Sequence, residues 1–550
     1  MIKTINALLI VWYLLSANTT FAFSHADTLR GSNGRGRDWW KVKYYNLLVT
    51  FDTAKRTISG ENTISLAVTK KPADSMQIDL QEPMVIDSVL LSVHSDDTDA
   101  HVPISFKREG NVWWLTHHFS DWPRGATKDL QIFFHGKPRE AVRAPWDGGF
   151  TWTNDSTGNA WVAVSCQGLG ASVWWPCKDA QWDEPDNGMS IALTVPKGMK
   201  AVSNGKLLLV SDNDDLQTYS WGVKDPINNY DVTFYIGDYV HWSDTLMGEK
   251  GKLDLNFWVL RENESKAKKQ FDIVKNMLHC FEYWMGPYPF YEDGYKLVDA
   301  PYLGMEHQGA VAYGNKYKMG YLGYDRTFTG IGMEFDYIIV HESGHEWFGN
   351  NVTANDMADN WVHEGITTYS EALYVECTQG KEKAQKYCRG EWRGIENDKP
   401  IIGPYGVNEE GSNDMYDKGA AIMHMIRTLT NDDEKFRQML RGLGKDHYHQ
   451  TVSSREIEGD ISWHTGLNLT AFFDEYLRTT KIPQLEYTIK NNELNYRFNN
   501  IVTGFTLPVT VTSEDATMAT VSPTAEWQHI KWAGKGDVKF SKDFLIKVKK

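Results

Sequence analysis

Residues 341–345 read His341-Glu342-Ser343-Gly344-His345, and Glu364 follows after eighteen intervening residues. Residues four apart share one face of an α-helix, so both imidazoles can reach the same ion. Glu342, beside the first histidine, can act as a base on a metal-bound water. A catalytic zinc takes three protein ligands and keeps one position open, which makes Glu364 a candidate third ligand. The stretch therefore predicts a zinc-binding helix that faces a second helix.

Other interpretations of these residues remain open. The two histidines could lie on a surface helix without a common role, and Glu364 could be a solvated carboxylate favoured at a helix N-terminus. His363 could compete as a ligand, although one residue's offset turns it about 100° away on a helix. Asp359 is a candidate acceptor for the N–H of a ligand histidine, or a helix cap. The surrounding sequence has to decide between these interpretations.

Helical periodicity surrounds the motif, and short strands precede it. Apolar residues recur at helical spacing in residues 266–285, 333–350, 361–377, 418–430 and 470–477. Short strand-like runs bounded by Gly, Asn, Asp or Pro include residues 45–51, 63–68, 112–117, 130–135 and 191–195. Alternation returns in residues 485–489 and 494–498. We therefore predict a multidomain α+β chain, with a large N-terminal antiparallel β domain (30–243), a mainly helical domain (244–481) and a small, β-sandwich-like C-terminal module (482–550).

Composition excludes several classes of protein. The chain has 550 residues with 57 Lys plus Arg against 72 Asp plus Glu, a net charge of −15. A nucleic-acid-binding protein needs a basic face, and docking on anionic lipid needs basic clusters, so neither partner is expected. Hydrophobic residues make up 41% of the chain, which is enough for packed cores and excludes a mostly disordered protein.

The N-terminus has the pattern of a secretory signal peptide. Lys3 supplies a positive charge, an apolar run covers residues 7–15, and small residues precede possible cleavage after Ala22 or Ala26. The run is shorter than the roughly 20 residues of a membrane span, and no other segment is long enough. We therefore predict a signal peptide over residues 1–22, export to the periplasm or the extracellular space, and no stable membrane insertion.

Export would allow cysteines to pair, but five cysteines in 550 residues do not make a disulfide scaffold. Cys377 and Cys388 flank a probable turn and could meet, and Cys166 and Cys177 are close in sequence. Buried free thiols are an equally good interpretation of either pair. With Cys280 the number is odd, so at least one thiol stays unpaired within the chain.

With further motifs, the chain resembles the aminopeptidase N family of zinc metallopeptidases, the gluzincins that include leukotriene hydrolase. The matching stretches, in the family's order, are Gln167 with Asp183-Glu184-Pro185 downstream, Met305-Glu306, Trp347-Phe348-Gly349-Asn350 and Tyr416-Asp417-Lys418-Gly419. The resemblance covers roughly residues 163–419. It implies a thermolysin-like, mainly helical catalytic domain in a short family member that lacks the large helical C-terminal domain of longer ones.

The resemblance implies a zinc-dependent aminopeptidase that hydrolyses N-terminal residues from peptides with a free N-terminus. It assigns one zinc per chain to His341, His345 and Glu364, with Glu342 as general base on the zinc-activated water. It places the Tyr416 hydroxyl as a donor to the developing oxyanion. The same resemblance implies a substrate-binding set in which Glu306 pairs with the α-ammonium; its members are Glu306, Gln167, Gly304 and Met305.

Three departures from the family's pattern affect this expectation. His363 stands where the family has Asn, and Leu303 replaces a Gly. His307 replaces an Asn beside Glu306, so a cationic His307 would compete with the substrate ammonium and lower activity at acidic pH. Two alternatives remain: epoxide hydrolysis at the same zinc site, and a non-catalytic peptide-binding relative. The preferred N-terminal residue and the oligomeric state are not readable from the sequence.

Overall fold

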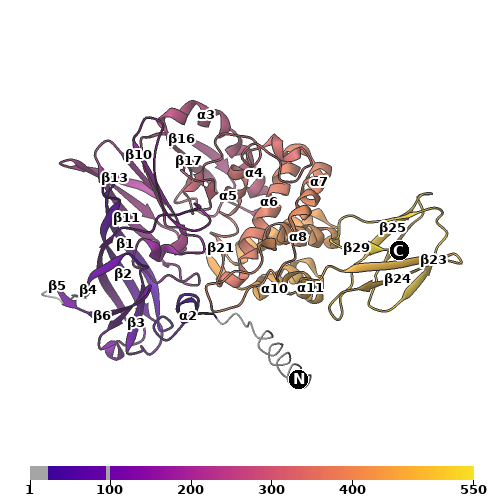
Figure 1. Cartoon of the computed structure of the whole chain (residues 1–550), viewed down its shortest axis with the longest axis horizontal. Coiled ribbons are helices and arrows are strands. Elements are labelled where there is room, and N and C mark those ends of the chain that lie inside the picture. The colour runs from indigo at the N-terminus through magenta and orange to yellow at the C-terminus, as the bar shows by residue number, and fades with distance from the viewer. Residues whose placement is uncertain (1–22, 95–98) are drawn as a thin grey trace, which may run out of the picture.

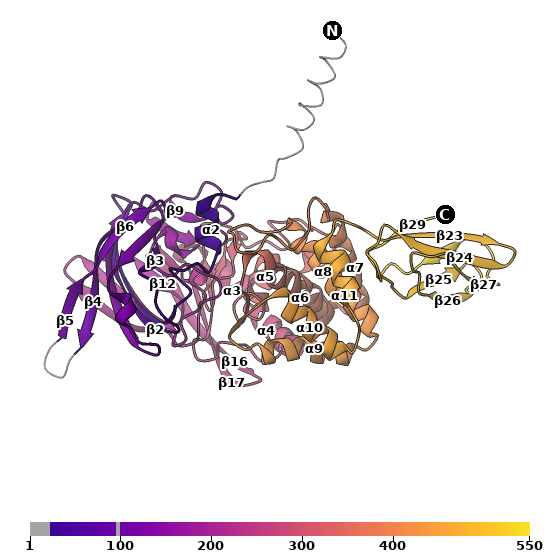
Figure 2. The same cartoon turned by 90° about the horizontal axis from the view of Figure 1, so that it is seen from below.

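The structure is a computed structural model that describes residues 23–94 and 99–550. The predicted signal peptide, residues 1–22, lies outside the described residues. Three parts follow one another along the long axis: a β-rich N-terminal part, a helical middle part and a C-terminal β module (Figures 1 and 2). The multidomain α+β prediction is therefore confirmed.

The N-terminal part is built on an eight-stranded sheet in the order β13-β14-β11-β1-β2-β8-β4-β5. Its strands are β1 Trp40–Asp52, β2 Thr57–Val68, β4 Val85–His94, β5 Asp99–Pro103, β8 Thr127–Gly136, β11 Met189–Pro196, β13 Lys206–Asn213 and β14 Leu216–Val223. All neighbours pair antiparallel except β1 with β11, which pair parallel. The period-2 pattern that predicted these strands lets β11 bury every second residue.

Two smaller antiparallel sheets accompany it, and a short helix, α2 His25–Gly31, precedes them all. One contains β3 Ser75–Asp79, β7 Val112–Thr116 and β6 Ser105–Glu109; the other contains β12 Lys200–Ser203, β15 Phe234–Gly237, β10 Ala160–Ser165 and β9 Gly149–Asn154. Their shared core is rich in fully buried tryptophans, among them Trp39, Trp40, Trp174 and Trp175. Aromatic packing of this β core thus accounts for much of the high tryptophan content.

The middle part combines a five-stranded sheet with the helices. The sheet contains β16 Tyr239–Gly248, β17 Gly251–Leu260, β18 Tyr295–Asp299, β20 Val311–Tyr313 and β19 Gly304–Met305. The helices are α3 Glu264–Gln270, α4 Ile273–Met285, α5 Tyr337–Gly344, α6 Trp361–Gln379, α7 Lys381–Glu391, α8 Asp417–Thr430, α9 Asp433–Asp446, α10 Ser454–Thr465 and α11 Thr470–Arg478. A small parallel strand pair, β21 Val352–Ala354 with β22 Gln450–Val452, connects the segment after α5 with the segment after α9.

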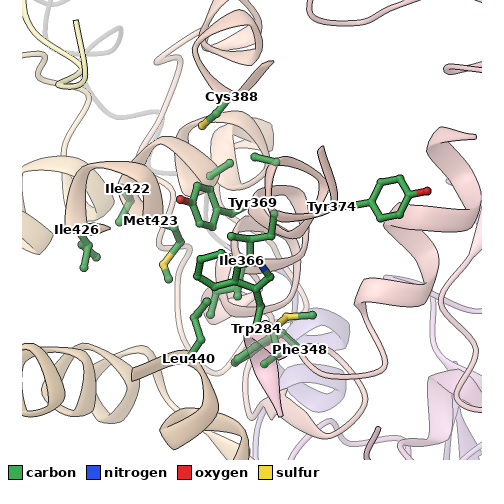
Figure 3. Close-up of a cluster of buried hydrophobic side chains, with 14 of the residues drawn as sticks. Trp284, Phe348, Ile366, Tyr369, Tyr374, Cys388, Ile422, Met423, Ile426 and Leu440 are labelled. Carbon is green, nitrogen blue, oxygen red and sulfur yellow. The ribbon is translucent and has the colours of Figure 1, made fainter. Parts of the chain in front are cut away.

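The helices of this part share one continuous core. Figure 3 shows side chains from α4, α6, α7, α8 and α9 gathered around Ile366 and Tyr369 on α6. Helix α6 is buried along nearly its whole length, so it is the central helix of the domain. Its exposed residues lie only in its last turn.

The structure corrects several predicted helix boundaries. The helix expected over 266–285 is two helices, because the chain turns at Phe271 and Asp272 between α3 and α4. The helix expected over 333–350 starts only after Asp336, whose carboxylate accepts from the N–H groups of Ile338 and Ile339, and ends at Gly344. Helices α7, α9 and α10 were not predicted. Helix α7 is mostly polar and buries few apolar side chains, so few apolar positions mark it in the sequence.

The C-terminal module consists of two small sheets. One contains β23 Gln484–Lys490, β24 Glu493–Asn499, β27 Gln528–Lys531 and β29 Lys547–Lys549; the other contains β25 Val509–Ser513, β26 Met518–Val521 and β28 Val538–Phe540. The module contacts the helical part through Asp543, which binds Arg389 at 2.7 Å and His424 at 3.2 Å. These ion pairs fix the module against α7 and α8.

Neither of the two cysteine pairs considered from the sequence forms, and the alternative interpretation, buried free thiols, is confirmed for Cys166 and Cys177. Cys280 on α4 and Cys377 on α6 form a disulfide, whereas Cys166, Cys177 and Cys388 are buried free thiols. The predicted pairs were based on closeness in sequence, but the helix packing brings together residues 97 positions apart. The prediction that at least one thiol stays unpaired is confirmed. No helix among the described residues is long and apolar enough to cross a bilayer.

This disulfide leads to a testable expectation for stability. Closing a loop of about 100 residues restricts the unfolded chain by about 4–5 kcal/mol in the chain-entropy model. The double variant Cys280→Ser/Cys377→Ser should melt at a lower temperature than the wild type, and a reductant should lower the melting temperature of the wild type but not of this double variant. Cys388→Ser is the control and should keep the reductant sensitivity. Alkylation of Cys280 and Cys377 in denatured, unreduced protein would contradict the pairing.

Candidate metal centre

Close packing of two helices brings the predicted ligands together. A Cβ on Gly344 of α5 would lie 2.6 Å from the hydroxyl of Ser370 on α6, so only glycine permits this approach. This close contact explains why a glycine lies within the helix of the motif. On the other side of α6, a Cβ on Gly365 would lie 2.9 Å from Gly419 Cα on α8. Helix α6 is thus held between the helix of the motif and the helix that follows Tyr416.

The three predicted ligands lie within reach of one ion. The carboxylate of Glu364 lies 3.7 Å from His341 Nε2 and 3.3 Å from His345 Nε2. The three ligand atoms all lie within 4.8 Å of one another, and all three side chains are buried. The solvated-glutamate interpretation of Glu364 is therefore wrong.

Each imidazole is oriented through its other nitrogen. His341 Nδ1 lies 2.7 Å from Glu371 Oε1, and His345 Nδ1 lies 3.1 Å from the carbonyl oxygen of Phe348. These acceptors place the protons on Nδ1 and leave the Nε2 lone pairs directed at Glu364. Asp359 has neither of the two roles considered from the sequence, because its carboxylate accepts from Tyr405 and Ser454 and the residue at the N-cap of α6 is Asn360.

The donor set fits a zinc ion. Glu364 Oε2 is buried and makes no hydrogen bond within the described part of the chain, although two imidazole nitrogens face it. An unpaired buried carboxylate oxygen is costly unless a cation compensates it. Two imidazole nitrogens and one carboxylate oxygen form a common catalytic zinc set. Burial lowers the pKa of His341, but the neighbouring carboxylates of Glu364 and Glu371 outweigh it and raise this pKa to about 10, so the site attracts positive charge.

Further carboxylates converge on the same centre. Burial raises the pKa of Glu342 to about 7, with His341 acting in the opposite direction. Burial also raises the pKa of Glu306, against the effect of His345. Gln167 joins the groups, because its amide donates to Glu306 at 2.9 Å and to Glu364 at 3.0 Å. The N-terminal part therefore contributes directly to the site.

Gly304 leaves the space that the carboxylate of Glu342, the candidate general base, occupies. Strand β19, Gly304–Met305, is the edge of the five-stranded sheet beside α5. A Cβ on Gly304 would lie 2.5 Å from Glu342 Oε1, so a larger residue would displace that carboxylate. Met305 is buried beside it, and Glu306 follows directly. The carboxylates of Glu342 and Glu306 therefore both lie close to the ligand His345.

A cavity of about 500 Å³ opens onto these groups. It is lined by every residue predicted for the site: Gln167, Gly304, Met305, Glu306, His341, Glu342, His345, Glu364 and Tyr416. The ring of Tyr416 stacks on that of His341, with centroids 6.2 Å apart at 24°. Burial and then Glu364 raise the pKa of Tyr416 well above its usual value, so its hydroxyl keeps the proton that it would donate.

His307 and His363, the two histidines that depart from the family's pattern, both have structural roles. His307 lies within hydrogen-bond distance of the Tyr235 hydroxyl, at 2.8 Å from Nδ1, and burial lowers its pKa to about 3. It therefore stays neutral at physiological pH, and the expected competition of a cationic His307 for Glu306 is wrong. His363 Nε2 accepts from the backbone N–H of Ala354 at 2.6 Å, so this nitrogen is not available to a metal.

Sequence reasoning missed three residues that support the site. Glu371 lies seven residues after Glu364, two turns along the same face of α6, and this spacing could have indicated it. Tyr230, from the N-terminal part, donates to Glu306 at 3.3 Å, and no local pattern indicates that contact. Tyr387 on α7 donates to the second oxygen of Glu371 at 2.6 Å, from a helix that was itself not predicted.

Comparisons with known proteins show what this chain is similar to. A model described as the peptidase M1 N-terminal domain matches residues 41–230, and one described as the peptidase family M1 domain matches residues 269–476. Endoplasmic reticulum aminopeptidase 1 of Mus musculus is 25% identical over 347 residues, covering 59% of this chain and 34% of that protein. Aminopeptidase M1 of Arabidopsis thaliana is also 25% identical, covering 58% and 37%. The matches thus span about a third of these relatives' length.

Leukotriene A-4 hydrolase of Xenopus laevis is 22% identical over 442 residues, covering 76% of this chain and 67% of that protein. Among solved structures, an M1 zinc metallopeptidase from Deinococcus radiodurans, a variant bound to Tyr-Ser-Ala, superposes with a TM-score of 0.67 at 19% identity. The superposition covers 82% of this chain and 96% of the other. At this identity the likeness establishes the fold.

The contact between His341 and Glu371 predicts an effect on metal affinity. Glu371→Gln keeps the shape but removes the charge that orients and polarises the imidazole, so zinc affinity should fall about 10- to 100-fold. Competition with a chelator of known affinity measures this. Tyr387→Phe is the matched control, because it removes only a donor to the other oxygen of Glu371, and its loss should be smaller. Unchanged affinity in Glu371→Gln would contradict the assigned role.

Proposed function

The chain belongs to peptidase family M1, and from this premise we propose that it is a zinc-dependent aminopeptidase that removes N-terminal residues from peptides. One zinc ion per chain would be held by His341, His345 and Glu364. When bound there, the ion supplies a Lewis acid that polarises the scissile carbonyl and activates water. The remaining chemistry rests on side chains of this protein.

The observation that carries the proposal is the position of Glu306. Its carboxylate is buried beside the three ligands, and Gln167 binds both Glu306 and Glu364 with one amide group. A negative charge at a fixed short distance from the metal suits a substrate whose α-ammonium lies one residue from the scissile bond. Such spacing favours removal of single N-terminal residues over internal cleavage.

Glu342 and Tyr416 would perform the proton transfer and the charge stabilisation. Glu342 is buried beside the ligands and can accept a proton from the attacking water, then pass it to the leaving amine. Tyr416 lines the same cavity and keeps its proton, so it can donate to the oxygen that gains negative charge. Glu342 would thus transfer protons, and Tyr416 would stabilise the negative charge.

The proposal also covers the class of substrate and the location of the protein. The M1 zinc metallopeptidase variant from Deinococcus radiodurans binds Tyr-Ser-Ala as substrate, which supports peptides with a free N-terminus as substrates here. Export to the periplasm or the extracellular space is supported by the signal-like sequence of residues 1–22 and by the Cys280–Cys377 disulfide, which an oxidising compartment favours. The intact set of ligands and base disfavours a non-catalytic relative, and no specific feature of the described residues favours epoxide hydrolysis.

Turnover of aminoacyl amides tests the reaction directly. Purified protein should release a fluorogenic amine from a panel of free aminoacyl amides, and a chelator should abolish the activity until zinc is restored. Glu342→Gln removes the proton acceptor, so turnover should fall by roughly 10²- to 10⁴-fold. Metal analysis of this variant is the control and should find zinc still bound. Near-normal turnover by Glu342→Gln would refute the assigned base.

Blocking the substrate's amino group tests the role of Glu306. An α-amino group has a pKa of about 8 and is largely charged at neutral pH, whereas its N-acetyl form has no charge and more bulk. The enzyme should therefore cleave free-amino peptides and leave N-acetylated peptides intact. Glu306→Gln should reduce affinity and turnover for free peptides together, since the buried pair is lost. Efficient internal cleavage of N-acetylated peptides would overturn the exopeptidase assignment while leaving the zinc site in place.

A further inference from the structure

The loop that carries Gln167, residues 166–170, connects strand β10 to the 3₁₀ helix Ala171–Val173. We call it the Gln167 loop. Two of its five residues are glycines with left-handed backbone angles, since φ is +70° at Gly168 and +89° at Gly170. Glycine restricts its own backbone less than any other residue does. The position of Gln167 therefore depends on contacts that hold the loop from outside.

Arg30, in the last turn of α2, lies directly against this loop. A Cβ on Gly170 would lie 1.7 Å from Arg30 Nη2, so the guanidinium fills the space that a side chain at this position would need. Arg30 Nη1 lies 2.8 Å from Asp179 Oδ2 and donates to the Ser172 hydroxyl at 3.3 Å. The same oxygen of Asp179 accepts from the backbone N–H of Ser172 at 2.9 Å. Arg30 and Asp179 together thus hold the end of the Gln167 loop.

The ion pair between Arg30 and Asp179 is well shielded from solvent. The exposed fraction of the side chain is 19% for Arg30 and 6% for Asp179. Among the described residues, Asp179 forms an ion pair with no other cation. Loss of Arg30 would leave a buried carboxylate without its charge partner, so the backbone around Asp179 would have to rearrange.

Asn408, from the helical part of the chain, contacts both the Gln167 loop and α2. Its side-chain amide donates to the carbonyl oxygen of Gly168 at 3.2 Å, and its backbone N–H donates to the carbonyl oxygen of Asp27 at 3.2 Å. Next to it, a Cβ on Gly31 would lie 2.1 Å from the carbonyl carbon of Val407. The end of α2 therefore packs directly on the backbone of the helical part.

Helix α2 is held by polar contacts. It lies at the border between the β-rich part and the helical part (Figures 1 and 2). None of its residues is buried. On the side of the β-rich part, Gln77 donates to the carbonyl oxygen of Leu29 at 3.0 Å and Arg37 donates to that of Arg30 at 2.8 Å. Because α2 buries so little apolar surface, ion pairs and hydrogen bonds decide where it lies.

We propose that α2 is a strap, a segment that links the N-terminal part to the helical part, and that Arg30 is a positioning residue for Gln167. The inference rests on the proposed aminopeptidase function. Arg30 does not line the cavity at the metal centre, so it acts through the loop. The amide of Gln167 reaches Glu306 at 2.9 Å and Glu364 at 3.0 Å, and a shift of the loop would break both contacts.

Substitution of Arg30 tests this role. With the aminoacyl amide that the enzyme cleaves fastest, kcat/KM of Arg30→Ala should fall about 10- to 100-fold, since a small misplacement of a positioning group is costly. Arg30→Lys keeps a charge for Asp179 and should recover part of the loss. Arg261→Ala is the control, because it removes an exposed ion pair with Asp238, and it should leave kcat/KM unchanged. An unchanged kcat/KM in Arg30→Ala, or an equal fall in Arg261→Ala, would overturn the proposal.

A double-mutant cycle separates positioning from a general loss of structure. If Arg30 acts through Gln167, then Arg30→Ala should change kcat/KM by less than about 2-fold once Gln167→Ala is present. Asn408→Ala removes an uncharged hydrogen bond to the loop, so its own loss should be smaller, about 2- to 10-fold, and should likewise vanish in Gln167→Ala. Losses that multiply in the double variants would show that Arg30 and Asn408 act independently of Gln167 and would refute the assignment.

Hydrogen exchange tests the strap without any need for activity. The backbone amides of residues 166–170 should exchange faster in Arg30→Ala than in the wild type, whereas those of α6 should not change. Unchanged exchange in the Gln167 loop would refute the strap even in an active enzyme. Faster exchange, in a protein whose wild type cleaves no free-amino peptide, would support the strap and refute the aminopeptidase assignment instead.

Discussion

Three buried carboxylates that meet around two imidazoles are the constraint on which the rest of this structure depends. Glu306, Glu342 and Glu364 are each at least 92% shielded from solvent, and they lie beside His341 and His345. A cluster of this charge is stable only with a compensating cation. The fold therefore combines a strong electrostatic demand for a metal with a neighbouring carboxylate that remains available to a substrate's ammonium.

The helix packing serves this cluster. Gly344 lets α5 approach α6, and Gly365 with Gly419 lets α6 approach α8, so that the ligands and Tyr416 meet around one cavity. Gly304 does the same for strand β19 and Glu342. Glycines at these contacts therefore set the distances between the elements that carry the ligands, Glu342 and Tyr416.

The N-terminal β part is a component of the site. Gln167 binds both Glu306 and Glu364, and Tyr230 donates to Glu306. The carboxylate proposed to bind the substrate's ammonium is therefore held by hydrogen bonds from one part of the chain while belonging to another. Movement between the two parts would break the hydrogen bonds that Gln167 and Tyr230 donate to Glu306, which couples substrate binding to the relative position of the parts.

Features that depend on local spacing could be predicted from the amino-acid sequence. The i, i+4 histidines of the motif, the periodicity of α6 and the alternation of β1, β2 and β11 follow from helix and strand geometry, so nearby residues indicate them. Which distant groups meet became known from the packing of the folded chain. It pairs Cys280 with Cys377, gives His341 the partner Glu371 in place of Asp359, and buries His307 against Tyr235, where it stays neutral. These outcomes depend on how helices and sheets pack, because contacts between residues far apart in the chain have no local sequence signal.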